Sequence, residues 1–314
     1  MLRDFRSKDA DEFIPLYREN FAEEEALLGT DPVAMGRITR RLTGPFTRLA
    51  LTLARWIGRP IVRFFVVEVD GHLAGTALLS FTPNAGYVGL VQVAAPYRRR
   101  GLGQELLSAC ARDARRAKRR YLVLDVLTDN VAARALYDKL GFHPLRQNAY
   151  WVRYLGPEHP IDPSPFPLSL RSLQRGDGDL IAAIARAQVP PEVQAILPVD
   201  PRQYYLRPMV SQSLESDSEG WILEVGGRPS GFLRITTSHA MEAGHLTAPV
   251  IDASVPTDTA VEFLRAVLRR AVDRGARRIL CEVTTADPRV QLLLTGAGFE
   301  EAYRLDTLYE PLTN

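Results

Sequence analysis

The 314-residue chain contains only two cysteines, Cys110 and Cys281, and each lies within an apolar stretch. So few cysteines exclude a disulfide-rich scaffold, and their surroundings predict buried free thiols in a reducing compartment. The chain has only five histidines, and they show no metal-ligand spacing. We therefore expect no bound metal ion.

Long hydrophobic runs and a strong charge imbalance are also missing. No apolar run approaches the roughly 20 residues needed to span a bilayer, which predicts no integral membrane segment. The first residues, MLRDFRSKDADEF, are too charged for a secretion signal. A net charge of only +2 gives no overall argument for binding nucleic acid. These features together predict a cytoplasmic protein.

The length predicts two domains of about 150 residues each. Residues 156–167, GPEHPIDPSPFP, contain five prolines and are typical of a stiff linker between domains at 1–155 and 168–314. The second half repeats the first, because VLDV at 123–126 recurs as LCEV at 280–283, 157 residues later. Phe5-Arg6-Ser7 also resembles Leu170-Arg171-Ser172, and Glu68 aligns with Glu224.

The most informative stretch is YVGLVQVAAPYRRRGLGQ at 87–104. Residues 87–93 predict a strand, and the apolar residues from Leu102 onward recur at helical spacing. The glycines between them predict a tight turn into a helix N-terminus, where free backbone N–H groups and the helix dipole attract anions. Together with three arginines, this turn predicts a phosphate-binding site.

The order V-x-x-P-x-R-x-x-G-x-G is filled by Val93, Pro96, Arg98, Gly101 and Gly103. It is neither a P-loop nor a dinucleotide fingerprint. Residues 130–142, NVAARALYDKLGF, then fill a second pattern, N-x-x-A-x-x-L-Y-x-x-x-G-F. Both patterns resemble those of the GNAT N-acetyltransferase superfamily. The resemblance implies an α/β fold of the α+β type in each half, a mixed and mostly antiparallel sheet flanked by helices.

The resemblance also implies a binding site for acetyl-CoA as co-substrate. Pantetheine would pair with the central strand, and pyrophosphate would meet the glycine turn and its arginines. Asn130 resembles a CoA-contacting asparagine of the superfamily, and it is equally suited to cap the following helix. The implied cofactor-binding residues are Val91, Val93, Arg98, Arg99, Arg100, Gly101, Leu102, Gly103, Gln104 and Asn130.

Two residues are candidates for the catalytic proton transfers. The resemblance implies that Tyr137 is the general acid, because a phenol is matched to the departing thiolate; the alternative is a core aromatic residue. Asp125 is the candidate base, since ribosomal-protein N-terminal acetyltransferases, which this core resembles, have an acidic residue at that position. Asp125 is equally compatible with a structural carboxylate at a strand end. Glu68 and the run Glu23-Glu24-Glu25 are weaker alternatives.

The functional positions do not recur in the second half. Val255, Asp258 and Ala260 replace the arginine and glycines, Leu294 replaces the tyrosine and Asp287 replaces Asn130. Asp258 would place a negative charge where pyrophosphate belongs. We therefore expect a degenerate second domain that is structural or forms a wall of the acceptor site.

The leading hypothesis is an acetyl-CoA-dependent N-acetyltransferase acting on a primary amine of a small molecule. The alternatives are a protein N-terminal or lysine acetyltransferase and a non-enzymatic acyl-CoA sensor or partner module. The arginine-rich segment Arg37–Arg63 predicts a helix with a basic face, and a nucleic-acid or membrane-surface role for it is disfavoured by the balanced charge. Both a monomer and a homodimer are compatible with a tandem pair.

Overall fold

A computed structural model describes residues 1–21, 62–163, 165–174, 176–204, 216–238 and 243–312. The N-terminal half contains strands and helices in the following order: β1 (Leu2–Asp4), α1 (Ala10–Asn20), β2 (Val62–Val69), β3 (His72–Phe81), β4 (Ala85–Val93), α5 (Leu102–Arg116), β5 (Tyr121–Leu127), α6 (Val131–Lys139) and β6 (His143–Tyr154). Short 3-10 turns precede α1 and α5.

The C-terminal half repeats this plan. Its elements are β7 (Leu170–Ser172), α7 (Asp177–Gln188), α8 (Pro191–Ile196), β8 (Ser216–Val225), β9 (Arg228–Ser238), β10 (Ala243–Leu246), β11 (Val250–Ile251), α9 (Thr257–Asp273), β12 (Arg278–Thr284), α10 (Pro288–Gly296) and β13 (Glu300–Pro311). A further 3-10 turn, Pro201–Tyr204, follows α8.

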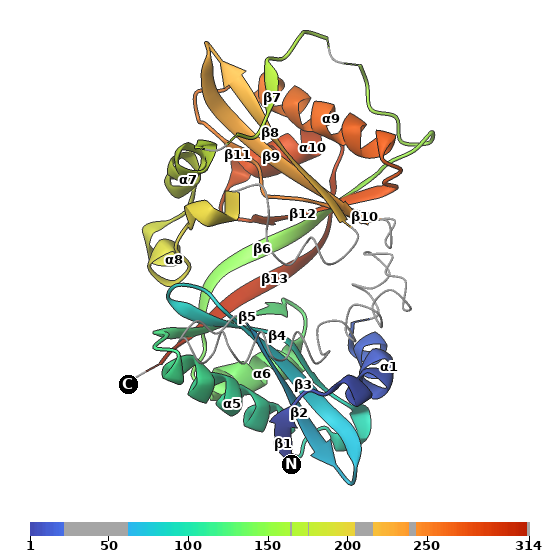
Figure 1. Cartoon of the computed structure of the whole chain (residues 1–314), viewed down its shortest axis with the longest axis vertical. Coiled ribbons are helices and arrows are strands. Elements are labelled where there is room, and N and C mark those ends of the chain that lie inside the picture. Colours follow the sequence, from blue (N-terminus) through green and yellow to red (C-terminus); the bar gives the residue numbers. More distant parts are fainter. Residues whose placement is uncertain (22–61, 164, 175, 205–215, 239–242, 313–314) are drawn as a thin grey trace.

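The two halves share one sheet because their last strands are exchanged. The strand order is β1-β2-β3-β4-β5-β13-β6-β12-β10-β9-β8-β7, with β11 attached to β9. The last strand of the chain, β13, pairs with β5 of the first half, and β6 pairs with β12 of the second. These two long strands also pair with each other and run through the middle of the molecule (Figure 1). The predicted mixed sheet with flanking helices is confirmed, and it is continuous across the chain.

Helices cover both faces of the N-terminal part of the sheet. The residues of α5 and α6 pack on one face, where Leu106 meets Leu124 in a core cluster. On the other face α1 packs Phe13 and Leu16 against Val66. The helical spacing predicted from Leu102 onward is confirmed, since Leu106, Leu107, Cys110, Ala111 and Ala114 are all buried. Both cysteines are buried free thiols, and burial raises the pKa of Cys110 to about 12.

Some predicted boundaries change. The sequence predicts a strand over residues 2–6, which ends at Asp4, and a helix from Asp9, which begins at Ala10 and is described as far as Asn20. The dipeptide Asp70-Gly71 predicts a two-residue hairpin turn, and this turn joins β2 to β3 with both residues in the left-handed region.

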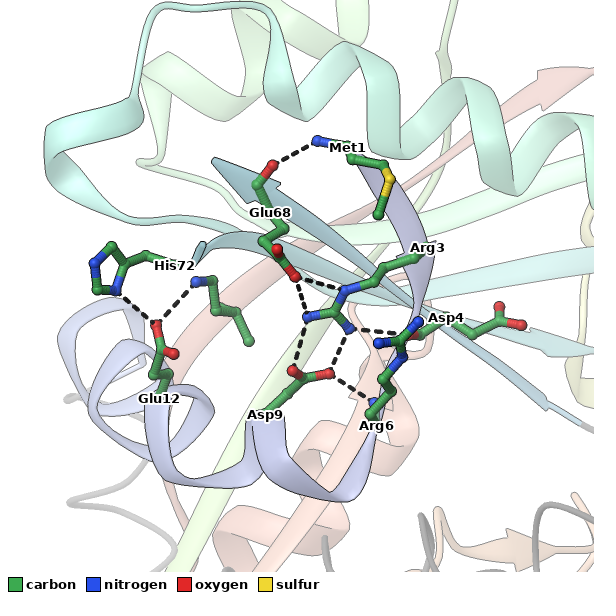
Figure 2. A network of polar contacts seen from close by, with 9 residues as sticks. Met1, Arg3, Asp4, Arg6, Asp9, Glu12, Glu68 and His72 are labelled. Atoms are coloured by element: carbon green, nitrogen blue, oxygen red, sulfur yellow. Dashed lines mark hydrogen bonds and ion pairs between the residues drawn. The ribbon is translucent and has the colours of Figure 1, made fainter. Parts of the chain in front are cut away.

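The first strand is tied to its surroundings by a network of ion pairs (Figure 2). The Arg3 guanidinium donates to both carboxylate oxygens of Asp9, at 2.6 and 2.8 Å, and its Nε donates to Glu68 at 2.8 Å. Asp9 also accepts from the Arg6 amide. This arrangement makes Glu68 a structural residue of the β1–β2 edge, which removes it as an alternative base.

The C-terminal half contains the same network. Arg171 donates to both oxygens of Asp177, at 2.7 and 3.0 Å, and to Glu224 at 2.7 Å. Arg3 lies opposite Val66 in the sheet and Arg171 lies opposite Ile222. The equivalent triplets are therefore Leu2-Arg3-Asp4 and Leu170-Arg171-Ser172, so the sequence alignment that used residues 5–7 was wrong by three positions. Its pairing of Glu68 with Glu224 was correct.

Replacing Arg3 by methionine should lower the free energy of unfolding. Only 9% of the Arg3 side chain and 5% of Asp9 are exposed, so the change leaves a partly buried carboxylate unpaired. We expect a loss of about 2 kcal/mol, because the pair lies at the edge of the sheet and costs less to break than a central one. Chemical denaturation at neutral pH measures the loss, and Arg171→Met should reproduce it.

The loss should shrink at low pH. Burial opposes ionisation of Asp9, but hydrogen bonds from Arg3 and the Arg6 amide hold its pKa below the usual value. A carboxyl with a lowered folded-state pKa stabilises the fold above its unfolded pKa and loses that contribution as pH falls. The difference between wild type and variant should therefore be constant near neutrality and decline below about pH 4. A difference that grows in acid would contradict this assignment.

Candidate active site

The two parallel strands at the centre of the first half separate part of the way along. Strand β4 pairs with β5 from Ala85 to Val88, opposite Tyr121 to Leu124. Beyond this point β4 continues to Val93 and β5 continues to Leu127, but the two strands no longer pair with each other. The segment Gly89–Val93 therefore has no partner strand on its β5 side. Such a gap leaves backbone groups free to pair with an extended ligand.

A β-bulge lies at the beginning of this gap. Leu90 has a φ of 51°, which is unusual for a residue with a side chain, and the register with β3 shifts at the same place. The Thr76 hydroxyl donates to the Leu90 carbonyl at 3.2 Å, and the Gln92 amide donates to that hydroxyl at 2.9 Å. Buried hydrogen bonds thus hold a strained backbone in place, a feature that concentrates at functional sites.

The glycine turn after β4 has the geometry expected of an anion site. Gly101 has a φ of 80° and forms the N-cap of α5, and no side chain caps that helix. A Cβ on Gly103 would come within 3.0 Å of the Leu136 side chain, so a glycine there lets α5 pack closely on α6. Leu102 is half-buried and Gln104 is exposed. The first turn of α5 therefore presents backbone N–H groups to solvent beside the gap.

The three arginines of the turn differ in their surroundings. Arg98 donates to the Val93 carbonyl at 3.0 Å and forms a 2.9 Å ion pair with Glu19 of α1. Its guanidinium therefore fastens the turn to the strand end and to α1. Arg99 and Arg100 are exposed, and the Arg100 guanidinium lies over the Tyr97 ring. These two are the arginines of the turn that remain suited to a phosphate.

The remaining predicted CoA contacts lie around the gap. Val91 and Val93 are half-buried on the separated part of β4, although the Val93 carbonyl already accepts from Arg98. Asn130 caps α6, and its side-chain oxygen accepts from the Ala133 amide at 3.1 Å. The predicted capping role of Asn130 is confirmed, and its contact with CoA stays a prediction.

Tyr137 lies on the α5–α6 side of the sheet. It is buried within the same core cluster as Leu106 and Leu124, with its ring centroid 5.7 Å from that of Phe142. Burial raises its pKa to about 12. No described residue hydrogen-bonds its hydroxyl. The side chain is thus held by packing, and its phenol group keeps its proton at any physiological pH.

Asp125 lies on the opposite face of β5. Its neighbours Leu124 and Val126 belong to the α5–α6 core, so alternation along the strand directs Asp125 away from that core. Tyr87 of β4 donates to one carboxylate oxygen, and Thr307 of the exchanged strand β13 donates to the other at 2.6 Å. Burial, followed by the Asp125 charge, raises the pKa of Tyr87. The phenol therefore stays a donor, and Asp125 is held firmly beside the gap.

Asp125 and its repeat partner Glu282 are joined by hydrogen bonds across the exchanged strands. The amide nitrogen of Asn148 donates to Glu282 at 2.7 Å and to the Thr307 hydroxyl at 3.3 Å. Thr307 then donates to Asp125. Burial and the Asp125 charge raise the pKa of Glu282, against hydrogen bonds from Tyr150 and Asn148. The two carboxyl groups therefore belong to one polar cluster at the centre of the sheet.

Sequence analysis missed most of this cluster. Glu282 aligned with Asp125 in the repeat, and that alignment was the available signal for its place in the cluster. Tyr87, Asn148 and Thr307 carried no such signal, because their roles depend on strands distant in the chain. Two histidines stay outside this cluster. His72 follows a turn signal that predicts a surface position, and it is exposed; His143 is also exposed, at the start of β6, with its ring 5.9 Å from that of Tyr309.

The second half keeps the fold without the phosphate turn. Helix α9 begins at Thr257 after Pro256, earlier in the repeat than α5, and Asp258 accepts from the Thr259 amide at 2.8 Å. Asp287 caps α10 as Asn130 caps α6, and Leu294 is buried in place of Tyr137. The degenerate second copy predicted from the sequence is consistent with these contacts.

Several sequence predictions fall outside the described residues. These are the acidic run Glu23-Glu24-Glu25 and the arginine-rich helix, apart from Arg63. Arg63 lies in β2, where it pairs with Asp4 and Asp113 at 2.7 and 2.9 Å. In the part of the chain that the structure describes, no cluster of His, Cys, Asp or Glu is arranged for a metal, and a metal-free protein stays a prediction.

Comparisons with known proteins identify the class of the first half. The model of the Acetyltransferase (GNAT) family matches residues 34–142, which include the separated strands, the glycine turn and α6. The N-terminal half therefore contains a GNAT acetyltransferase domain.

One curated relative is a Bacillus subtilis (strain 168) protein, provisionally named as a ribosomal protein bS18-alanine N-acetyltransferase. It is 30% identical over 93 residues, which are 29% of this chain and 62% of the relative. The match thus spans less than two thirds of that relative's length.

The fold of the whole chain is that of tandem GNAT proteins. A tandem GNAT protein from the clavulanic acid biosynthesis pathway aligns over 100% of this chain and 99% of its own, with a TM-score of 0.65 and 13% identity. A GCN5-related N-acetyltransferase from Sphaerobacter thermophilus aligns over 100% and 96%, with a TM-score of 0.65 and 16% identity. At such identities the likeness shows the fold alone. Of the helices described, none is long and apolar enough to cross a membrane.

Proposed function

We propose that the N-terminal half transfers an acetyl group from acetyl-CoA to a primary amine of a small molecule by direct attack on the thioester. The observation that carries this proposal is the separation of β4 and β5 after Val88, directly beside the uncapped glycine turn of α5. The unpaired part of β4 suits an extended pantetheine chain, and the glycine turn that follows it suits a pyrophosphate.

Acetyl-CoA supplies the activated acyl group when it is bound. Backbone groups of Gly89–Val93 would hold its pantetheine, and the N–H groups of Leu102, Gly103 and Gln104 would hold its pyrophosphate. Arg99 and Arg100 would add charge beside that turn. Asn130 would contact the same ligand from the N-terminus of α6, next to its capping bond.

The two candidate catalytic side chains suit this arrangement because they lie on opposite faces of the sheet. A ligand seated between β4 and β5 would lie between the two faces of the sheet, with one candidate side chain on each face. Asp125, oriented by Tyr87 and Thr307, would take the proton from the attacking amine. Tyr137 would give its hydroxyl proton to the departing sulfur on the other face.

A small-molecule acceptor fits the construction of the central sheet better than a protein terminus. The polar side of the gap is continuous with the cluster formed by Asn148, Thr307 and Glu282, and the second half supplies part of it. A polar cluster of this kind recognises a compact polar amine.

The phosphate-binding turn can be tested with a variant that leaves the helix intact. Gln104→Glu places a negative charge in the first turn of α5, a position where acidic residues stabilise helices. The same charge repels pyrophosphate. We expect about tenfold weaker acetyl-CoA binding by calorimetry, with one site per wild-type chain and no loss of thermal stability.

Thr257→Glu is the matched control, since it adds the same charge to the first turn of α9 in the second half. It should leave acetyl-CoA affinity unchanged. Equal weakening by both variants would indicate a general charge effect. Undetectable acetyl-CoA binding by a folded wild type would reject the acetyltransferase proposal.

A further inference from the structure

The second half contains a cavity of about 410 Å³ at the place that corresponds to the gap between β4 and β5. Strand β10 pairs with β12 as far as Leu246, and the chain then turns away to β11. The cavity lies in this opening and extends to the exchanged strand β6. Its polar lining includes Arg146, Asn148, His245, Thr247 and Glu282.

Arg146 lines this cavity with a guanidinium that has no hydrogen-bond partner among the described residues. Its Nε is buried without a hydrogen bond, and no other guanidinium nitrogen bonds a described residue. No described carboxylate lies within ion-pair distance of Arg146, although its charge acts across the cavity on Glu282 and opposes the rise in that residue's pKa. A guanidinium has five donors in a planar fork that matches a carboxylate. A buried guanidinium donor without a partner is costly, and an anionic ligand would supply that partner.

The cavity also has a negative side. Glu282 accepts hydrogen bonds from Asn148 at 2.7 Å and from Tyr150, and Asp287 caps α10 through one oxygen. A carboxylate has about four acceptor positions, so each group retains acceptor capacity. One guanidinium and two carboxyl groups thus line the same cavity. Its volume suits a compact molecule at the small end of typical ligand sites.

Coenzyme A does not suit this half. The carboxylate of Asp258 lies in the first turn of α9 and accepts a hydrogen bond from the Thr259 amide, a donor that a phosphate would need. Helix α9 has no glycine turn before it, since Pro256 forms its N-cap. The opening between strands therefore persists here without the turn that would bind pyrophosphate.

We propose that this cavity binds a small zwitterion, whose carboxylate pairs with the Arg146 guanidinium and whose amine is held by Glu282 and Asp287. The site lies between the exchanged strand β6 and elements of the C-terminal half, and it is separate from the acetyl-CoA site proposed beside β4 and α5. It does not depend on acetyl transfer, so its test does not use enzyme activity.

The test follows the arginine Nε–H resonances of the full-length protein by NMR. Arg146→Lys identifies the Arg146 signal by its disappearance. β-Alanine and γ-aminobutyrate, added up to about 100 mM, should shift that signal saturably, because a compact ligand with a few charge-assisted contacts binds in the millimolar range. Propylamine, which lacks a carboxylate, should not shift it. Arg153 is the internal control: it lies on the same strand but the opposite face, also with a buried Nε, and its signal should stay fixed.

A second variant tests the amine contact. Glu282→Gln should weaken β-alanine binding about tenfold and leave acetate binding unchanged, because acetate has no amine. The proposal is overturned if no carboxylate moves the Arg146 signal, if Arg153 moves equally, or if β-alanine binds no better than acetate. Coenzyme A that shifts Arg146 in the Gln104→Glu protein would also overturn it, since the cavity would then be a second CoA site.

Discussion

Tyr137→Phe should reduce kcat by about 100-fold or more while acetyl-CoA binds with unchanged affinity. The substitution removes one hydroxyl that has no partner among the described residues and leaves the ring packed against Phe142. Stability should therefore be preserved. Steady-state kinetics with a suitable amine and calorimetry with acetyl-CoA together measure this separation of chemistry from binding.

The pH profile gives a second readout of the same residue. Burial raises the pKa of Tyr137 to about 12, so its proton is available throughout the range in which the protein is assayed. The wild-type rate should show no alkaline decline from this group up to about pH 10. If Tyr137→Phe retains full kcat, Tyr137 is a core aromatic residue, which is the alternative that its sequence pattern left open.

Asp125→Asn should lower kcat/KM by about 100-fold at neutral pH, because an amide cannot accept the proton of the attacking amine. The same change disturbs the cluster, since Tyr87 and Thr307 both donate to the carboxylate and an amide has only one accepting oxygen. The melting temperature of the variant should therefore be measured together with its kinetics.

Asp129→Asn is the matched control for this substitution. Asp129 is exposed in the same strand-to-helix connection and has no described side-chain partner, so its loss should leave the rate unchanged. Asp125→Glu keeps the carboxylate and should lose less activity than the asparagine variant. If Asp125→Asn and wild type have equal rates, Asp125 is a structural carboxylate and another group removes the proton.

Local features of the fold were accessible from the sequence. The strand, glycine turn and helix at 87–116 are specified by residues close together in the chain, and the hairpin at Asp70-Gly71 follows from turn chemistry. The internal repeat predicted that the second half has the same fold, and the residues at the repeated positions predicted that it lacks the phosphate-binding turn. Asn130 and Asp287 are helix caps, which a single sequence position indicates well.

The exchanged strands were not accessible. The pattern of β6 and β13 fixes which face of each strand is buried, and it does not say which half supplies the neighbour. Asn148 and Thr307 look like ordinary polar residues of alternating strands, yet they connect Asp125 with Glu282 across the two halves. The positive φ of Leu90 was equally hidden, since leucine has no preference for that conformation.

The exchange of β6 and β13 also governs the order in which the protein becomes complete during synthesis. Asp125 accepts a hydrogen bond from Thr307, which lies 182 positions later in the chain and is therefore synthesised much later. While the ribosome is still elongating, β5 has a bare edge, and the first half lacks the strand that closes its sheet. Contacts of such sequence separation form slowly. The N-terminal half is made first, and its sheet is nevertheless completed only after β13 of the second half has been made.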